Sequence, residues 1–178
     1  MRSEKGFTLV EVLVVIMIIG MLMAMMIPKF GIARERARES AMKMNLHNVQ
    51  VVIEMFHTEQ GYYADDFYED EYGSYFPGGV WEEENGRFPT NPWTGRQMDA
   101  DEFNAEELYD TEIEVSDTSE DGPNDLWGYY PGEIVYGVYD PPGTWAPTHY
   151  GLLGFQHSGI SMRDVNVDEE IVIFVLHN

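Results

Sequence analysis

Cysteine is absent from the 178 residues of this sequence. Neither a disulfide framework nor a thiolate metal site can form, so the fold has to be stabilised by an apolar core. Hydrophobic residues make up 44% and aromatic residues 13% of the chain, which is enough for a core and too much for a disordered acidic tail. At this length we expect one folded unit rather than a large multidomain enzyme.

Basic residues are scarce beyond position 60. Residues 1–60 contain seven Lys/Arg and six Asp/Glu, a net charge of +1, whereas residues 61–178 contain three and 26, a net charge of −23. An acidic excess of this size repels phosphate backbones. Nucleic acid is therefore a poor partner for the C-terminal part.

Signatures of catalysis are also missing. The sequence contains no glycine-rich nucleotide-binding motif and no H-E-x-x-H spacing. His149 and His157 lie eight residues apart in a turn-rich stretch, which is not a spacing typical of zinc ligands. His47 and His57 are expected on the surface of a helix. We do not expect an enzyme.

One long apolar run is present near the N-terminus. Between Phe7 and Ile27 the only charged residue is Glu11, and about 20 apolar residues suffice to span the hydrocarbon core of a bilayer. The run is longer than the apolar part of a secretory signal peptide and lacks a small-residue cleavage site at its end. We therefore expect residues 7–30 to form a transmembrane helix. Its orientation is left open, because basic residues flank both ends.

Residues 31–60 continue the helical pattern in amphipathic form. Apolar residues recur there at spacings of three and four, and Gly61 is a plausible helix stop. The residues on the apolar face are Met42, Leu46, Val49, Ile53 and Phe56.

Residues 61–178 form an acidic, loop-rich region with strands near its end. Many turn formers are followed by three strand-like stretches at 133–139, 150–155 and 170–176. A sheet with one apolar face needs a cover, which the apolar helix face can supply. The expected fold class is α+β, with a long N-terminal helix packed on a small antiparallel sheet.

The start of the apolar run carries the most specific motif. A short leader with Arg2 and Lys5 is followed by the string Gly-Phe-Thr-Leu-Val-Glu at positions 6–11, and the apolar run then continues to Pro28. This pattern resembles the N-terminus of the type IV prepilin family, which includes the pseudopilins of type II secretion. The resemblance covers about the first 30 residues.

The resemblance implies a processing pathway. A membrane aspartyl peptidase would remove the leader, residues 1–6, by cutting between Gly6 and Phe7, and would then methylate the new amino group of Phe7. The N-terminus would be cytoplasmic and residues 61–178 would lie outside the cytoplasm. The protein would reside in the bacterial inner membrane as a single-pass protein and later in a pilus or pseudopilus.

Three residues in the helix are candidates for a role in assembly: Glu11, Thr8 and Pro28. A carboxylate in a lipid-facing helix costs about 2.5 to 3.5 kcal/mol at the bilayer centre and less near the interface, so Glu11 should have a partner. The free amino group of Phe7, from the same chain or from a neighbour in a filament, could be that partner. Thr8 offers a further polar contact or bonds to its own helix. Pro28 marks a point where the helix could bend.

Calcium is one ligand that the acidic region could bind. Residues 117–125 combine carboxylates, an amide and hydroxyls around a turn glycine, and hard cations prefer such oxygen ligands. The spacing is not that of an EF-hand. The candidate ligands are Asp117, Glu120, Asp121 and Asp125, and the alternative is a solvated acidic loop.

A second, weaker family element lies at residues 91–95. The sequence Asn-Pro-Trp-Thr-Gly there is similar to the Pro-Trp-Gly element of major type II secretion pseudopilins. Those proteins bind calcium through a loop close to the C-terminus, whereas the acidic loop here precedes the late strands. The correspondence of the two loops is left open.

Aromatic residues are dense among acids between positions 62 and 93. They could form a recognition surface, but tyrosine and phenylalanine in such a stretch more often pack a long loop onto the core. The residues are Tyr62, Tyr63, Phe67, Tyr68, Tyr72, Tyr75, Phe76 and Trp81.

The resemblance implies a structural subunit of a type IV pilus-like filament, and a type II secretion pseudopilin is the preferred assignment. The implied partners are further copies of the chain, other pilins or pseudopilins, the prepilin peptidase, an inner-membrane platform with its ATPase, and membrane lipid before assembly. One alternative is an adhesive or motility pilin, although such pilins often carry a C-terminal disulfide loop. Another is a minor subunit at the filament tip, and a third is a membrane-anchored extracytoplasmic binding module.

Overall fold

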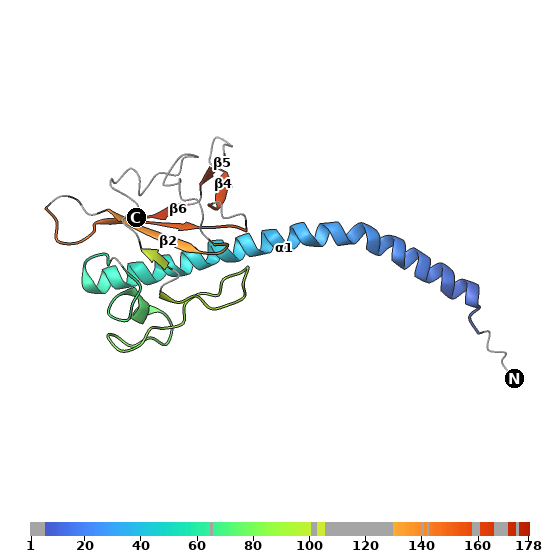
Figure 1. Ribbon diagram of the computed structural model, residues 1–178, viewed down its shortest axis with the longest axis horizontal. Coiled ribbons are helices and arrows are strands. Elements are labelled where there is room, and N and C mark those ends of the chain that lie inside the picture. Colours follow the sequence, from blue (N-terminus) through green and yellow to red (C-terminus); the bar gives the residue numbers. More distant parts are fainter. Residues whose placement is uncertain are drawn as a thin grey trace. The chain divides into compact units, whose positions relative to one another are not determined.

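The computed structural model describes residues 6–64, 66–100, 103–105, 130–139, 141, 143–157, 161–165, 171–173 and 175–178. The chain divides into two compact units, Met1–Ala37 and Arg38–Asn178. One helix, α1 (Leu9–Gln60), contributes to both units (Figure 1).

Helix α1 ends where the sequence predicts. Gly61 adopts a left-handed backbone conformation with φ of 83°, which a residue without a Cβ atom adopts at no steric cost. Its N–H donates to the carbonyl of His57 at 2.8 Å, so one of the last helix carbonyls is satisfied. The short 3-10 helix η1 (Tyr72–Tyr75) follows in the next segment.

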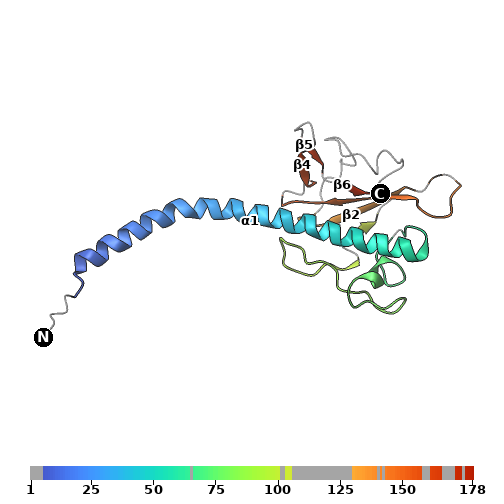
Figure 2. The ribbon, with the colours of Figure 1, turned by 180° about the vertical axis from the view of Figure 1, so that it is seen from behind.

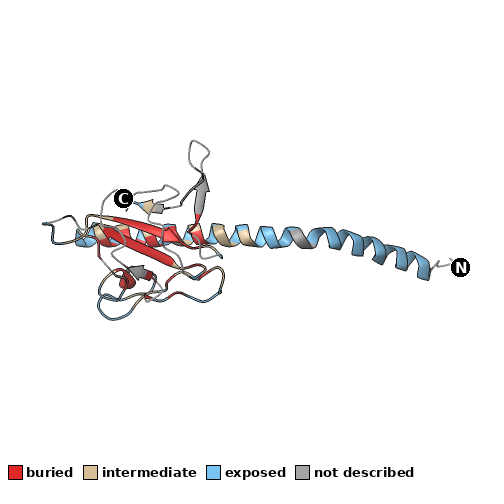
Figure 3. Ribbon diagram, turned by 45° about the horizontal axis from the view of Figure 1, so that its top comes forward, coloured by how far each residue is buried: buried red, intermediate tan, exposed pale blue. Residues whose placement is uncertain are grey.

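In the first unit the part of α1 from Val12 to Met26 is apolar on every side. The stretch Leu9–Met26 has a mean hydropathy of 2.7 and none of it is buried, as the exposed colour of this part shows in Figure 3. It is long and apolar enough to cross a membrane. A helix without a polar face needs apolar surroundings along its whole circumference.

In the second unit the same helix is amphipathic. The five side chains of the predicted apolar face, Met42, Leu46, Val49, Ile53 and Phe56, are all fully buried. They form the helix side of the core, so the periodicity prediction is confirmed.

The main sheet has four strands in the order β1-β2-β3-β6. Strands β2 (Ile134–Tyr139), β3 (His149–Gly154) and β6 (Val175–His177) are antiparallel neighbours, and the short β1 (Phe103–Ala105) pairs in parallel with β2. The predicted antiparallel sheet on a long helix is confirmed for three strands. The parallel edge strand β1 was not expected from the sequence.

The predicted strand at 170–176 contains two described strand segments. Strand β5 (Ile171–Ile173) pairs with β4 (Arg163–Val165) in a separate two-stranded sheet, whereas β6 pairs with β3. The prediction of strand structure is confirmed for these segments, and their pairing in two different sheets was not expected. The run from Ile171 to Leu176 is apolar at every position, so it lacks the alternation that would commit one face to one sheet.

The segment between α1 and β1 packs on the helix and on the sheet edge. In Figures 1 and 2 this green segment lies below the second half of α1, and strands β2 and β6 lie above the helix. The ring of Phe56 contacts Tyr72 edge-on at a centroid distance of 4.9 Å, and Phe67 stacks on Phe103 at 4.5 Å.

Most of the dense aromatic stretch therefore belongs to the core, which confirms the packing interpretation. Buried members are Tyr63, Phe67, Tyr72 and Phe76, partly buried members are Tyr62 and Tyr75, and Tyr68 and Trp81 are exposed.

Candidate functional site

The first turn of α1 closes with reciprocal hydrogen bonds between two side chains. Both the backbone N–H and the hydroxyl of Thr8 donate to Oε2 of Glu11 at 2.8 Å, and the N–H of Glu11 lies 3.3 Å from Oγ1 of Thr8. Thr8 immediately precedes the helix and Glu11 is its third residue. This arrangement is a capping box, in which two side chains satisfy backbone N–H groups that have no partner within the helix.

The predicted pairing of Glu11 with the amino group of Phe7 requires cleavage after Gly6, because Phe7 has only a peptide nitrogen in the uncut chain, and it stays a prediction. The hydrogen bond between Glu11 and Thr8 was not predicted, although the sequence contains the spacing Thr-x-x-Glu before an apolar run. That spacing is itself a signature of a capping box. The partner of Thr8, left open by the sequence, is the side chain of Glu11.

The predicted cleavage bond lies outside the helix. Gly6 and Phe7 precede α1, and the side chain of Phe7 is 88% exposed. Among the described residues, no atom lies within 4 Å of the position that a Cβ atom on Gly6 would occupy. The fold of this chain therefore sets no steric requirement for glycine at position 6.

Pro28 lies inside α1, which continues through it to Gln60. Because proline has no backbone N–H, it cannot donate the usual hydrogen bond to the carbonyl four residues earlier. The helix lacks one internal hydrogen bond at this position.

A second candidate site lies in the unit Arg38–Asn178, where the side chain of Asn91 holds two loops together. Asn91 Nδ2 donates to the carbonyl of Pro131 at 2.8 Å, and Oδ1 accepts from the N–H groups of Trp93 at 2.9 Å and Thr94 at 3.2 Å. Asn91 is buried. A Cβ atom on Gly132, whose φ is 82°, would collide with it. The 91–95 loop is thus fixed against the residues before β2.

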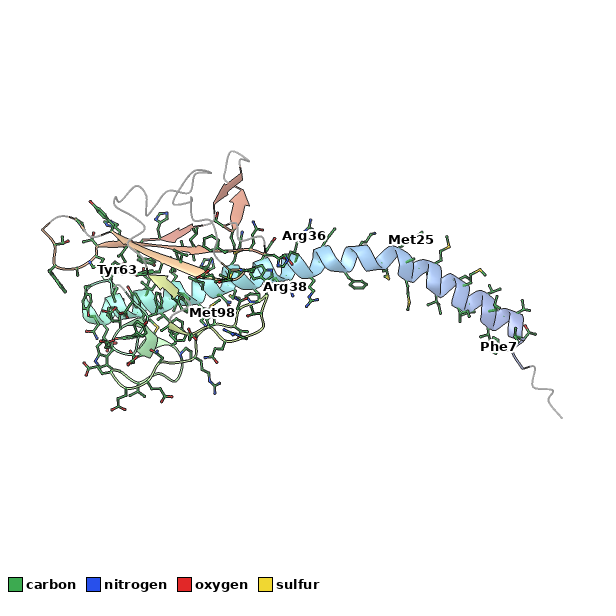
Figure 4. The ribbon with its side chains drawn as sticks, viewed as in Figure 1. Phe7, Met25, Arg36, Arg38, Tyr63 and Met98 are labelled. Carbon is green, nitrogen blue, oxygen red and sulfur yellow. The ribbon has the colours of Figure 1, made fainter. Side chains whose placement is uncertain are left out.

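These loops enclose a pocket of about 610 Å³. Figure 4 labels Arg38 on α1 and Met98 on the loop segment, which both line the pocket. Two arginines and a histidine are gathered there with aromatic rings. The principal lining residues are Arg38, Trp93, Arg96, Tyr130, Glu133 and His157.

The sequence contains no local pattern that indicates this pocket. It identified residues 91–95 as a family element and His157 as a weak zinc candidate, but Arg38 and Arg96 are far apart in the chain. Only the hydrogen bonds of Asn91 and the packing of α1 bring them together.

The histidines occupy different environments. His149 Nδ1 lies 3.0 Å from the hydroxyl of Thr148, and His57 is half-buried and stacks on Tyr63 at a centroid distance of 4.1 Å. His47 is exposed, as expected, whereas His57 is only partly exposed.

The candidate calcium ligands lie outside the described residues. Asp117, Glu120, Asp121 and Asp125 all fall in the segment 106–129, whose structure is not described. Within the described part of the chain, no three His, Asp or Glu side chains are placed to hold a metal ion.

Comparison with known proteins identifies the N-terminal region. Residues 1–27 match the family described as the prokaryotic N-terminal methylation motif. The chain is 39% identical over 64 residues to the type IV wide pilus major component PilA4 of Thermus thermophilus, which is 36% of this chain and 49% of that protein. It is 38% identical over 62 residues to the type IV major pilin protein PilA of Myxococcus xanthus, 35% of this chain and 28% of that protein. No solved structure matches the chain.

An all-round apolar N-terminal helix joined to an amphipathic half on a small sheet defines a membrane-anchored protein of α+β pilin-like fold. Residues 1–27 carry the N-terminal methylation motif of type IV prepilins, and part of the chain is homologous to two type IV pilins. Type IV pilins form filaments and are processed by a prepilin peptidase. The matches span about half the length of the first relative and less than a third of the second.

Proposed function

We propose that this protein polymerises through its N-terminal helix as a subunit of a type IV pilus-like filament. The observation that carries the proposal is the helix surface from Leu9 to Met26, which is apolar apart from Glu11 and unburied. Full burial of one large apolar side chain contributes about 1.5 to 3 kcal/mol. Such a helix therefore favours lipid before assembly and the packed helices of other subunits afterwards.

The N-terminal geometry supports processing before assembly. The Gly6–Phe7 bond precedes the helix and Phe7 is exposed, so a membrane peptidase can reach this bond without unwinding the helix. Cleavage would free the amino group of Phe7, which methylation would then modify. In this proposal the N-terminus is cytoplasmic and the acidic unit lies outside the cytoplasm.

Glu11 has a partner before and after assembly in this scheme. In the single subunit the hydroxyl and N–H of Thr8 bond its carboxylate, which lowers the penalty of holding a charge in the membrane. In the filament its carboxylate would also pair with the Phe7 amino group of a neighbouring subunit. A charge-assisted pair in a dry helix core would fix the register between subunits.

The relatives support a pilus as the assembled form, because both are named as major components of type IV pili. A pseudopilus of a type II secretion system is the second candidate. The Asn91-Pro92-Trp93-Thr94-Gly95 loop favours it, through its similarity to the Pro-Trp-Gly element of major pseudopilins. Deletion of the gene separates the two candidates. Loss of surface filaments would support the pilus, and loss of a secreted protein would support the pseudopilus.

Calcium binding is a separate proposal from the sequence alone. Asp117, Glu120, Asp121 and Asp125 supply the oxygen ligands that calcium prefers. Calorimetric titration of the full chain with calcium, repeated with magnesium and with Asp121→Ala, tests it. Equal heats of calcium titration for the wild type and Asp121→Ala would indicate that this segment is a solvated acidic loop.

The filament proposal is tested by intact mass and N-terminal sequencing of the protein from membranes of cells that contain a prepilin peptidase. We expect a mature chain that begins at Phe7 and carries one added methyl group. Electron microscopy of sheared filaments should then show the same mature chain. An intact Met1, or a cut after Ile27, would contradict the proposal and favour a simple anchored binding module.

A further inference from the structure

The pocket at Arg38 and Arg96 is unusual in so acidic a unit. Only three basic residues follow position 60, and one of them, Arg96, lines this pocket together with Arg38 and His157. Glu133 also lines it, and its Oε2 accepts a hydrogen bond from the backbone N–H of Tyr130 at 2.7 Å. With two arginines and one carboxylate, the lining carries a net positive charge. The pocket therefore combines cationic groups with aromatic walls, and its volume lies within the range of ligand sites.

An acidic loop with an aromatic residue lies elsewhere in the same unit. The side chains of Trp81, Glu82, Glu83 and Glu84 are all exposed. The loop is closed by backbone hydrogen bonds from Val80 N–H to the Glu84 carbonyl at 2.8 Å and from Glu84 N–H to the Val80 carbonyl at 2.9 Å.

The backbone of Glu82 in this loop has a strained conformation. Its φ of 57° lies in the left-handed region and is the only positive φ of a non-glycine residue among those described. Its N–H donates to the carbonyl of Glu69 at 3.0 Å. Strained backbone conformations persist only where surrounding contacts maintain them, and they occur often at binding sites. These contacts thus hold the acidic loop in one conformation.

The pocket and the acidic loop lie at opposite ends of the unit. The Trp81 ring lies 6.2 Å from the ring of Phe56, whereas Arg38 lines the pocket. Arg38 and Phe56 are 18 residues apart on α1, which is about 27 Å at 1.5 Å per residue. Figure 4 shows Arg38 at one end of this stretch of helix and Tyr63, just after the helix, at the other.

We infer that the acidic loop 81–84 of one copy docks into the Arg38–Arg96 pocket of a second copy. Two different surfaces on one chain make a head-to-tail contact, which repeats along a helical polymer instead of closing into a dimer. Between chains of charge −22, a cationic pocket is the place where an acidic loop can approach with attraction. Arginine binds carboxylates through paired hydrogen bonds, and Trp81 can stack on the aromatic wall.

The inference rests on the proposed polymerisation, because one loop in one pocket is smaller than a stable interface. Packing of the apolar helices brings the copies together, and the acidic loop then fixes how neighbouring units meet. High salt should loosen this contact, because it screens exposed charges.

The absence of cysteine permits a direct test. Filaments are assembled from a chain with Glu83→Cys and Thr94→Cys, where Thr94 is an exposed residue of the pocket, and are then oxidised. We expect a ladder of cross-linked multimers on a denaturing gel. Each single substitution should give monomers.

The matched control replaces the pocket cysteine by one in the basic segment before it. A chain with Glu83→Cys and Arg36→Cys places the second thiol on α1, where Arg36 is exposed. A ladder from this control alone would assign the acidic loop to the basic helix segment and would overturn the pocket assignment.

Charge exchange gives an independent measurement. Arg96→Glu and Glu83→Arg should each reduce the yield of intact filaments several-fold after shearing, and the double variant should restore it. Filaments that form normally without the 83–94 ladder would overturn this inference and leave polymerisation intact. A mature chain that forms no filaments at all would refute the proposed function, and the docking contact with it.

Discussion

At residue scale the Tyr136 hydroxyl is the centre of a buried network. It donates to the Ala64 carbonyl at 2.7 Å and lies 2.8 Å from the Tyr72 hydroxyl, which accepts from the N–H of Ala64 at 2.9 Å. Both tyrosines are buried. The network satisfies the backbone of Ala64 inside the core, where an unpaired polar group costs about 1 to 3 kcal/mol.

Burial raises the pKa of Tyr136 well above its ordinary value, and burial also raises the pKa of Tyr72. The folded state therefore keeps protons that the unfolded chain loses above about pH 10. The contribution of the two hydroxyls to stability is fully present below about pH 10 and is lost as the pH rises beyond it. We expect the free energy of unfolding to fall by up to about 1.4 kcal/mol per pH unit for each tyrosine.

Denaturant unfolding of the full chain in detergent, measured between pH 8 and about pH 12, checks this dependence. Tyr136→Phe should lower the stability by about 1 to 3 kcal/mol at neutral pH and make the decline above pH 10 shallower. Tyr130→Phe is the control, because the side chain of Tyr130 is 79% exposed. An equal pH dependence in the wild type and Tyr136→Phe would contradict the prediction.

At the scale of single elements, helix α1 could be predicted almost in full. Its apolar run, its buried face from Met42 to Phe56 and its stop at Gly61 are all local patterns. Strands β2 and β3 also follow from apolar and aromatic runs bounded by turn residues. Strand β1 could not be found, because a three-residue parallel pairing depends on β2, which is distant in sequence.

The capping box sets where α1 begins. Thr8→Ala removes the acceptor for the Glu11 N–H and the hydroxyl donor to its carboxylate, and loss of an N-cap costs about 0.5 to 2 kcal/mol. We expect faster amide hydrogen exchange at residues 9–12 of the full chain in detergent micelles. Thr8→Ser should retain slow exchange, since serine is an equally good cap. Unchanged exchange in Thr8→Ala would show that the box contributes nothing to the helix start.

At the scale of the whole molecule, two kinds of site differ in how far the sequence reveals them. The N-terminal motif is contiguous, so Gly6, Phe7, Thr8 and Glu11 could be read from a few adjacent positions. The pocket joins α1, the 91–95 loop and the residues on either side of the β2–β3 pair. Such a site forms only after folding, and no spacing of residues in the sequence indicates it.

In the proposed filament Glu11 pairs with the amino group of a neighbouring subunit, and one substitution separates that proposed role from capping. Glu11→Gln keeps an acceptor oxygen for Thr8, because glutamine also completes a capping box, but it removes the charge that would pair with the Phe7 amino group of a neighbour. We expect normal cleavage after Gly6 and slow amide exchange at the helix start. Filament yield should fall at least about tenfold, since a hydrogen bond to a charged group contributes about 1.5 to 3 kcal/mol. The yield is measured as sheared filament protein against total mature protein. Full assembly of Glu11→Gln would contradict pairing between subunits and restrict Glu11 to its capping role.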